Sequence, residues 1–208
     1  MSKVNQVISP SQPFTTCIDN SRSDCKIILG LDLGTNCGYC FGLIYKEKEE
    51  VVILPEYMGQ WDLSAGPYDS GAIRFVRLRR FLNEVKPDLV AYEDVKFTPS
   101  EALTRFSAAR VLARASTSAE LIGAFRATVV TWCEEKDIPC TGIPIGTIKK
   151  RATGKGNASK ELIIEACNKE FKTDFDIKDY ATTGADNVSD AAWIVKVASE
   201  QYSSGIKW

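Results

Sequence analysis

The stretch KIILGLDL, residues 26–33, is an almost continuous apolar run that contains one acid, Asp32, and leads into Gly34-Thr35-Asn36. Short apolar runs that end in turn-forming residues are typical of buried β-strands. A carboxylate at such a position loses hydration unless a partner compensates its charge. Asp32 is therefore the first candidate for a functional residue. The alternative is an aspartate that only supports the following turn.

The pattern after this strand predicts a mixed α/β fold. Residues 38–45 and 51–62 are expected to form two more strands of an antiparallel meander, separated by the charged turn KEKEE. Helical crossovers between later strands favour parallel pairing. We therefore expect a five-stranded sheet, with three antiparallel strands and then two parallel ones, flanked by helices. The later elements are expected to be a helix at 71–85, a strand at 88–93, a helical stretch at 99–136 broken near 116–118, a strand at 138–143, a basic loop, and helices at 159–171 and 186–201.

Length and composition indicate one globular domain. The chain has 208 residues, of which 44% are hydrophobic and 25% charged, as expected for a single core. Residues 1–25 are rich in Ser, Pro, Asn and Gln, so we predict a flexible leader followed by a domain over 26–208. No stretch approaches the roughly 20 apolar residues that span a bilayer, and the leader lacks the features of a signal or transit peptide. A cytoplasmic location without a membrane partner is expected, in the host cytoplasm if the source is a virus.

Seven cysteines and no histidine restrict the chemistry that is available. An odd number of cysteines, several of them within apolar runs, is typical of reduced core residues. Cys37 and Cys40 have CxxC spacing, but neither a second pair nor a histidine exists to complete a zinc site, so core positions in a strand are favoured. Without an imidazole, acid–base chemistry falls to carboxylates and metal-bound water.

Two further acids occupy places where this architecture puts functional groups. Glu93 ends the apolar strand DLVAYE, and Asp190 precedes the apolar stretch AAWIV of the last helix. If the strands of Asp32 and Glu93 are neighbours, their carboxylates repel each other unless a cation compensates. Hard oxygen ligands suit magnesium or manganese, and two ions per site would serve in-line displacement at a phosphodiester. Asp190 could otherwise be a first-turn partner of the helix dipole.

Asp186 and Asn187 are alternative candidates for a fourth ligand. They precede Asp190 by four and three residues, so either can share its face of the helix. Each could instead cap the helix N-terminus. The sequence leaves these alternatives open.

Positive charge is unevenly distributed although the net charge is −1. Segment 147–160 contains no acid, and its glycines Gly154 and Gly156 would allow a close approach of the backbone to phosphates. Its basic residues are Lys149, Lys150, Arg151, Lys155 and Lys160. A second cluster, residues 74–80, contains four arginines and is equally well explained as a solvated face.

The order of these motifs resembles the RuvC-type Holliday junction resolvases of the RNase H-like superfamily. Residues 28–41 (ILGLDLGTNCGYCF), 92–97 (YEDVKF) and 123–126 (GAFR) resemble segments of that family. Residues 147–163 (TIKKRATGKGNASKELI) resemble its Lys-containing loop of the form K-x(3–4)-G-x-G-x-A-x-K. Residues 186–191 (DNVSDA) resemble the closing D-N-x-x-D-A of phage-type members. Many cellular members have a fourth acid or a histidine where this chain has Asn187, and the stretch between residues 97 and 116 is longer than usual.

The resemblance implies a homodimer that resolves four-way junctions in DNA recombination and repair by paired symmetric nicks, with a metal-activated water as nucleophile. Lys160 would lie near the scissile phosphate and offset the charge that builds there. Phe97 would stack on bases at the branch point, unless it is an ordinary core aromatic. The metal ligands would be Asp32, Glu93, Asp190 and either Asp186 or Asn187, and the phosphate contacts would be Lys149, Lys150, Lys155 and Lys160.

Three other functions are compatible with parts of the sequence. The string LDLGT is similar to the phosphate-binding turn of the actin, hexokinase and heat-shock ATPase superfamily. Those proteins need two such domains and a second phosphate loop, and GxxxxGK[ST] is absent here, so no nucleotide cofactor is expected. A related nuclease acting on other branched DNA or structured RNA is the second alternative. A DNA-binding scaffold without catalysis is the third, and the three acids count against it.

Overall fold

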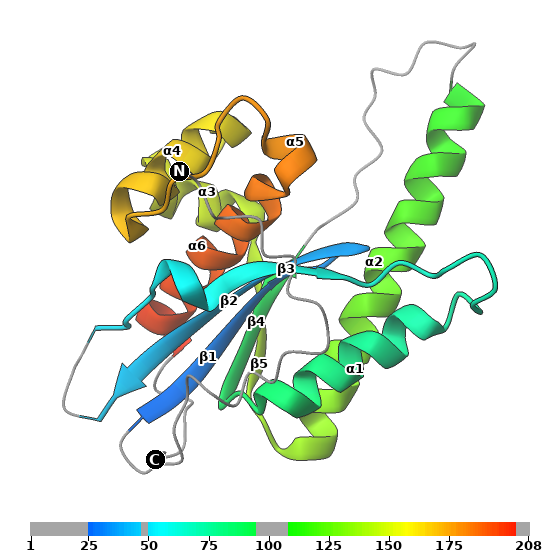
Figure 1. The fold of residues 1–208 in the computed structure, drawn as a ribbon, viewed down its shortest axis with the longest axis horizontal. Helices are drawn as coiled ribbons and strands as arrows, with labels where there is room; N and C mark the ends of the chain where they lie inside the picture. Colours follow the sequence, from blue (N-terminus) through cyan, green and yellow to red (C-terminus); the bar gives the residue numbers. More distant parts are fainter. Residues whose placement is uncertain (1–24, 47–49, 95–107, 203–208) are drawn as a thin grey trace.

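The architecture, known from a computed structural model, is a five-stranded sheet with helices on both faces (Figure 1). The structure describes residues 25–46, 50–94 and 108–202, without the side chains of 108–117 and 202. The strands are β1 (Cys25–Asp32), β2 (Asn36–Tyr45), β3 (Met58–Asp62), β4 (Leu89–Asp94) and β5 (Cys140–Pro144). Their order is β3-β2-β1-β4-β5; β2 pairs antiparallel with β1 and β3, while β4 pairs parallel with β1 and β5. The predicted sheet is confirmed.

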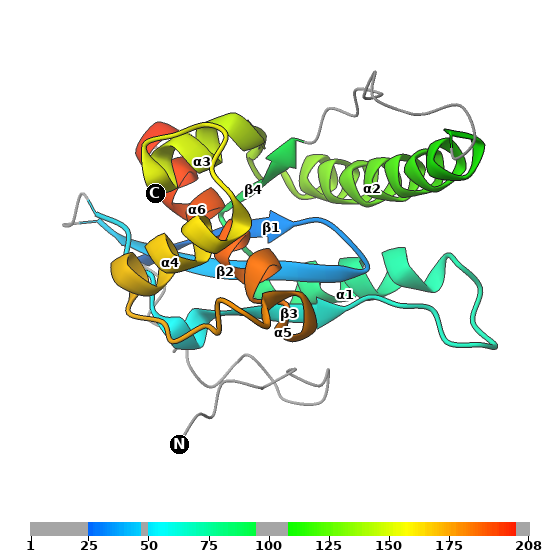
Figure 2. The same ribbon diagram turned by 90° about the horizontal axis from the view of Figure 1, so that it is seen from above.

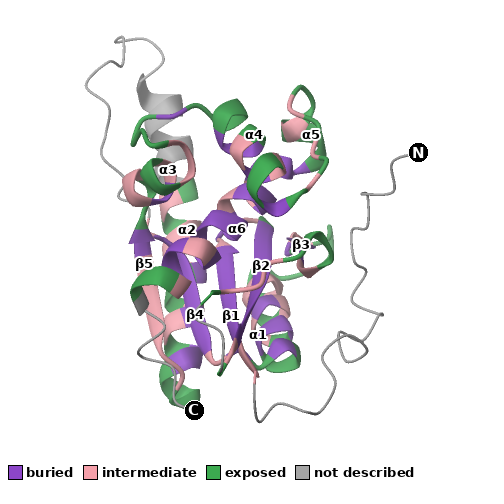
Figure 3. Cartoon of the chain, turned by 90° about the vertical axis from the view of Figure 1, so that its left-hand side faces the viewer, coloured by how far each residue is buried: buried purple, intermediate pink, exposed green. Residues whose placement is uncertain are grey.

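Two groups of helices cover opposite faces of the sheet (Figure 2). The helices are α1 (Ile73–Val85), α2 (Ala108–Lys136), α3 (Ile145–Thr153), α4 (Lys160–Phe171), α5 (Tyr180–Thr183) and α6 (Ala185–Tyr202). Buried residues of α1 and α2 form one core with one face of the strands, and those of α3, α4 and α6 form a second core with the other face. The central strands are consequently buried along most of their length (Figure 3). No helix within the described ranges is long and apolar enough to cross a membrane.

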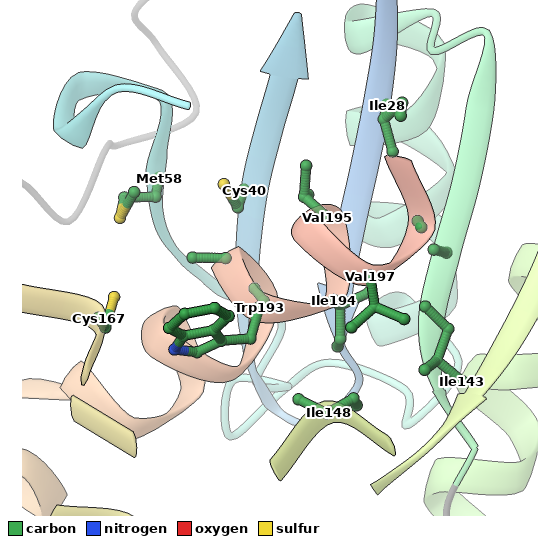
Figure 4. Packing of buried hydrophobic residues seen from close by; sticks show 14 of the residues in the cluster. Ile28, Cys40, Met58, Ile143, Ile148, Cys167, Trp193, Ile194, Val195 and Val197 are labelled. Carbon is green, nitrogen blue, oxygen red and sulfur yellow. The ribbon is translucent and has the colours of Figure 1, made fainter. Parts of the chain in front are cut away.

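Helix α6 lies directly on β1 and β2 (Figure 4). A Cβ atom at Gly38 would overlap the backbone carbonyl of Asn187, and one at Gly30 would overlap Ala191 and Val195. The missing side chains therefore let the helix backbone approach the sheet closely. Trp193, Ile194 and other apolar side chains of α6 then fill the space toward α3, α4 and the sheet. This close packing sets the distance from the sheet at which the polar residues of α6 lie.

Several predicted elements have different bounds. The third strand begins at Met58 rather than 51, because a short 3-10 helix, Pro55–Tyr57, interrupts it and only Val52 bridges to Leu43. The predicted break near 116–118 was wrong, since α2 runs from Ala108 to Lys136. Serine and threonine each cost a helix only about 0.5 kcal/mol, too little to break one of this length. Part of the predicted basic loop is helix α3, and α5 was not predicted. The predicted leader lies almost wholly outside the described residues.

The CxxC pair is divided by the sheet. Cys37 is buried in the core beneath α1 and α2, whereas Cys40 is buried in the core beneath α6. Residues three apart in a strand point to opposite faces. Both thiols are free, and their placement agrees with the interpretation as core residues.

Candidate active site

The carboxylates of β1 and β4 lie side by side on the face covered by α6. Leu31 of β1 pairs with Tyr92 of β4, and both side chains belong to the core under α1 and α2. Because side chains alternate along a strand, the next residues, Asp32 and Glu93, point to the opposite face. The strand alternation thus brings together the two acids that the sequence predicted as neighbours.

Helix α6 brings two more carboxylates to the same place. Asp186 lies in its first turn and Asp190 one turn later. Glu93 is 8% exposed and Asp186 9% exposed, whereas Asp32 and Asp190 are half-buried. We call Asp32, Glu93, Asp186 and Asp190 the acidic cluster.

Burial raises the pKa values of Asp32, Glu93 and Asp190, and repulsion by other acids adds to the rise at Asp32 and Asp190. The pKa of Asp32 lies well above its usual range because of burial and because of the charges of Asp190, Glu93 and Asp186. Burial, the charge of Glu93 and that of Asp186 raise the pKa of Asp190 to about 7. Burial also raises the pKa of Glu93, although two nearby lysines oppose this rise. A site with these properties holds an unfavourable concentration of negative charge that a cation would relieve.

Two lysines border the acidic cluster. Lys160, the first residue of α4, forms an ion pair with Asp186, and its side chain is 54% exposed. Burial opposes its charge, but the hydrogen bond to Asp186 and the charges of the other acids raise the pKa of Lys160. Lys149 of α3 donates a hydrogen bond to the carbonyl of Ala158 at 3.0 Å. Its charge lowers the pKa values of Glu93 and Asp190. Lys149 therefore links α3 to the residues before α4 and also favours the charged form of two acids of the cluster.

The acidic cluster offers hard oxygen donors, which are the ligands that magnesium and manganese prefer. Over the described ranges, no three Asp, Glu, Cys or His side chains are arranged so that they could hold a metal ion. The four carboxylates therefore act on one another electrostatically without meeting at one point. Asp186 is directed to Lys160. The donor chemistry fits a divalent cation, and the assignment of ligands stays a prediction.

Asn187 contacts the sheet. Its side-chain nitrogen donates to the carbonyl oxygen of Asn36 at 3.1 Å and to Oε1 of Gln60 at 3.1 Å. Asn187 therefore links α6 to β2 and β3. Gln60 was not among the site residues predicted from the sequence. Its only signal was a polar residue inside a strand segment, MGQWD, with apolar residues on both sides.

The basic residues differ in how they are engaged. Lys150 and Lys155 are exposed. Arg151 instead forms a bidentate ion pair with Glu200, in which Nε donates to Oε2 at 2.8 Å and Nη2 donates to Oε1 at 2.7 Å. In the arginine cluster, Arg77, Arg79 and Arg80 form ion pairs with Asp69, Glu135 and Glu84, in agreement with a solvated face. Phe97 lies outside the described residues.

The sheet order, with the acidic cluster between its central strands and the last helix, defines an RNase H-like fold of the RuvC type. RuvC of Thermus thermophilus is similar over 86% of this chain and 97% of its own, with 16% identity and a TM-score of 0.58. The T. thermophilus RuvC structure in complex with Holliday junction substrate gives 17% identity, 86% and 96% coverage, and a TM-score of 0.59. The fowlpox virus resolvase in complex with substrate Holliday junction DNA gives 13% identity, 84% and 97% coverage, and a TM-score of 0.50.

At these identities the likeness establishes the fold alone. No protein-family model and no curated protein matches the chain. The predicted RuvC-type fold is confirmed, and the phage-type likeness of residues 186–191 stays a prediction.

Proposed function

We propose that the protein is a metal-dependent, structure-selective endonuclease that resolves four-way DNA junctions by paired symmetric nicks. The observation that carries this proposal is the acidic cluster, of which two members are buried and two half-buried, at the ends of β1 and β4, faced by α6 and bordered by lysines. The fold supports the choice of substrate, because RuvC and the fowlpox resolvase were solved with Holliday junction DNA.

The residues of the acidic cluster would hold magnesium or manganese, two ions per site. Asp32, Glu93 and Asp190 would be ligands, and Asp186 is favoured as the fourth because its charge acts on Asp32 and Asp190. When bound, the ions would supply Lewis acidity toward water and the phosphodiester. The chain itself keeps these acids partly or fully out of water, so that each charge interacts more strongly than it would in bulk solvent.

Lysines would bind the DNA backbone around this site. Lys160 would leave Asp186 for the scissile phosphate when the acid is compensated by a cation, and would offset charge that develops there. Lys149 would hold the start of α4 in place and add positive potential. Exposed Lys150 and Lys155 would contact phosphates on either side.

Paired nicks require two sites. The described residues contain one acidic cluster, so we propose that a homodimer supplies the second. A protein that sediments as a monomer, both free and with a junction, would contradict this part of the proposal.

Cleavage of a synthetic four-way junction in magnesium tests the function. Asp32→Asn and Glu93→Gln should each lower the cleavage rate by at least 1,000-fold and leave junction affinity within about threefold of wild type, because they remove ligands but not phosphate contacts. Asp94→Asn is the matched control, because Asp94 adjoins Glu93 but pairs outward with Arg126 at 3.1 Å. It should cut at close to the wild-type rate.

A substrate panel separates the alternatives. Faster cutting of forks, flaps or structured RNA than of junctions would favour the related nuclease, and junction binding without any cutting would favour the scaffold. Robust ATP hydrolysis without nuclease activity would overturn the proposal.

A further inference from the structure

One row of residues crosses the sheet beneath the start of α6. Asp32 of β1 pairs with Gly38 of β2, and Gly38 pairs with Gln60 of β3. The row therefore begins at an acid of the cluster and ends at an amide side chain. The first turn of α6 lies across it.

Close contacts fix the helix to this row at two points. A Cβ atom at Gly38 would overlap the carbonyl of Asn187, and a Cβ atom at Gly184 would overlap the side-chain amide of Gln60. Gly184 also has a positive φ of 73°, which favours glycine at the residue before α6. The helix start thus has little room to shift relative to β2 and β3.

The side chain of Asn187 adds directional bonds to this packing. Its Nδ2 atom donates to Asn36 O and to Gln60 Oε1, each at 3.1 Å. Both acceptors belong to the sheet, and both hydrogens of the amide are used. A carboxylate at the same position could donate neither bond. Asn187 also adds no negative charge to a place that already holds four acids.

We propose that Asn187 and Gln60 form an amide clasp that sets the position of Asp186 and Asp190 against Asp32 and Glu93. Asn187 is then a positioning residue, and the fourth carboxylate of the site is Asp186. This inference rests on the metal site of the proposed function. Of the two candidates that the sequence left open, Asp186 and Asn187, the proposal selects Asp186 as the ligand.

The clasp and a ligand role make opposite predictions for Asn187→Asp. If Asn187 were a ligand, a carboxylate would bind magnesium more tightly than an amide, and the dissociation constant would fall. If Asn187 is part of the clasp, the new carboxylate faces two acceptor oxygens, and the helix start is released. Loss of groups that orient metal ligands typically weakens binding 10- to 100-fold. We therefore expect Asn187→Asp and Asn187→Ala to raise the magnesium dissociation constant about tenfold.

The measurement is calorimetric titration of the DNA-free protein with magnesium, with the magnesium-dependent shift in melting temperature as a second readout. Gln60→Ala should weaken magnesium binding as much as Asn187→Ala, although Gln60 cannot be a ligand on the clasp model. The double variant should be no weaker than either single variant, because both remove the same contact. Junction cleavage by these variants should recover at high magnesium, whereas that of Asp190→Asn should not.

Asn168→Ala is the matched control for general destabilisation. Asn168 of α4 makes a comparable set of bonds, but its partners, Phe175 and Thr173, lie in the segment after α4 rather than in α6 or the sheet. It should lower the melting temperature and leave the magnesium dissociation constant unchanged.

The outcomes separate the clasp from the function. Tighter magnesium binding by Asn187→Asp, or unchanged binding by Gln60→Ala, would overturn the clasp and leave the nuclease proposal standing. Magnesium binding by the wild type without junction cleavage would overturn the nuclease proposal, while the clasp would still be judged by the dissociation constants. A wild type that binds neither magnesium nor manganese would overturn both.

Discussion

The two faces of the sheet are built by different means. Under α1 and α2, three large aromatic rings are stacked on one another. The ring centroid of Trp61 lies 4.7 Å from that of Tyr39 and 4.5 Å from that of Phe81. Under α6, glycines of β1 and β2 let a helix backbone rest on the sheet. Both faces hold a buried hydrophobic core, but only on the glycine face does the close approach of a helix determine where acids lie. Both sides of the sheet therefore contribute to stability, but the acidic cluster lies on one side only.

The largest expected effect comes from breaking the aromatic face. Trp61→Ala should lower the free energy of unfolding by about 3–5 kcal/mol, because a ring that is 1% exposed is removed from between two others. Chemical denaturation measures this loss. Val76→Ala on α1 is the control, since Val76 is 60% exposed, and it should change stability by less than about 0.5 kcal/mol. The remaining folded Trp61→Ala protein should bind magnesium as the wild type does. If it bound magnesium tenfold more weakly, the two faces would not be independent.

Replacing glycine by alanine should lower the stability of the protein on the α6 side of the sheet and raise it on the α2 side. Gly38→Ala places a methyl group against the backbone of α6 and should cost about 1–3 kcal/mol. Gly123→Ala in α2 meets no atom within 4 Å and should stabilise the protein by about 0.5–1 kcal/mol, because alanine favours a helix over glycine. Thermal denaturation of both variants provides the comparison. Gly38→Ala should also weaken magnesium binding. If this variant lost stability but kept its magnesium affinity, α6 would be able to shift without disturbing the acidic cluster.

Sequence patterns were informative where a single segment determines its own structure. The apolar run 26–33 and the strand 88–93 were predicted because burial on both faces requires continuous apolar residues. Asp32 and Glu93 stood out because each is charged where its neighbours are apolar. The basic segment 147–160 was predicted as a loop because of its glycines, yet α3 occupies its first half and ends at Thr153, followed by Gly154, which has φ of 77°. A glycine that ends a helix looks like a loop glycine in sequence.

Contacts between distant segments could not be predicted. Gln60 and Asn187 are 127 residues apart and meet only because Gly38 lets α6 descend onto β2. The ion pair of Lys160 with Asp186 likewise joins α4 to α6 across 26 residues. Sequence spacing placed Asp186 and Asn187 equally well on the face of Asp190. Their different partners come from the tertiary structure.

The smallest expected effect concerns pH and the charge stored on the α6 face. The pKa of Asp190 rises from an ordinary value of 3.8 to about 7 in the folded protein. Between these values the folded state keeps a proton that the unfolded state has released, so this group favours folding at low pH and loses that contribution as pH rises toward 7. Metal-free Asp190→Asn should therefore be more stable than wild type at pH 8, by about 1–2 kcal/mol after allowance for partial exposure, and equally stable at pH 4.

Denaturation of wild type and Asp190→Asn from pH 4 to pH 8 measures this difference, and the subtraction removes carboxylates that both proteins share. Asp94→Asn should show no such gain at pH 8, because Asp94 faces Arg126 rather than other acids. Magnesium at pH 8 should reverse the ranking, since a cation compensates the charges of the wild-type cluster and finds one ligand fewer in the variant. Equal stability of the two metal-free proteins at pH 8 would mean that the acidic cluster carries no repulsion for a metal to relieve, and the glycine face would then differ from the aromatic face in packing alone.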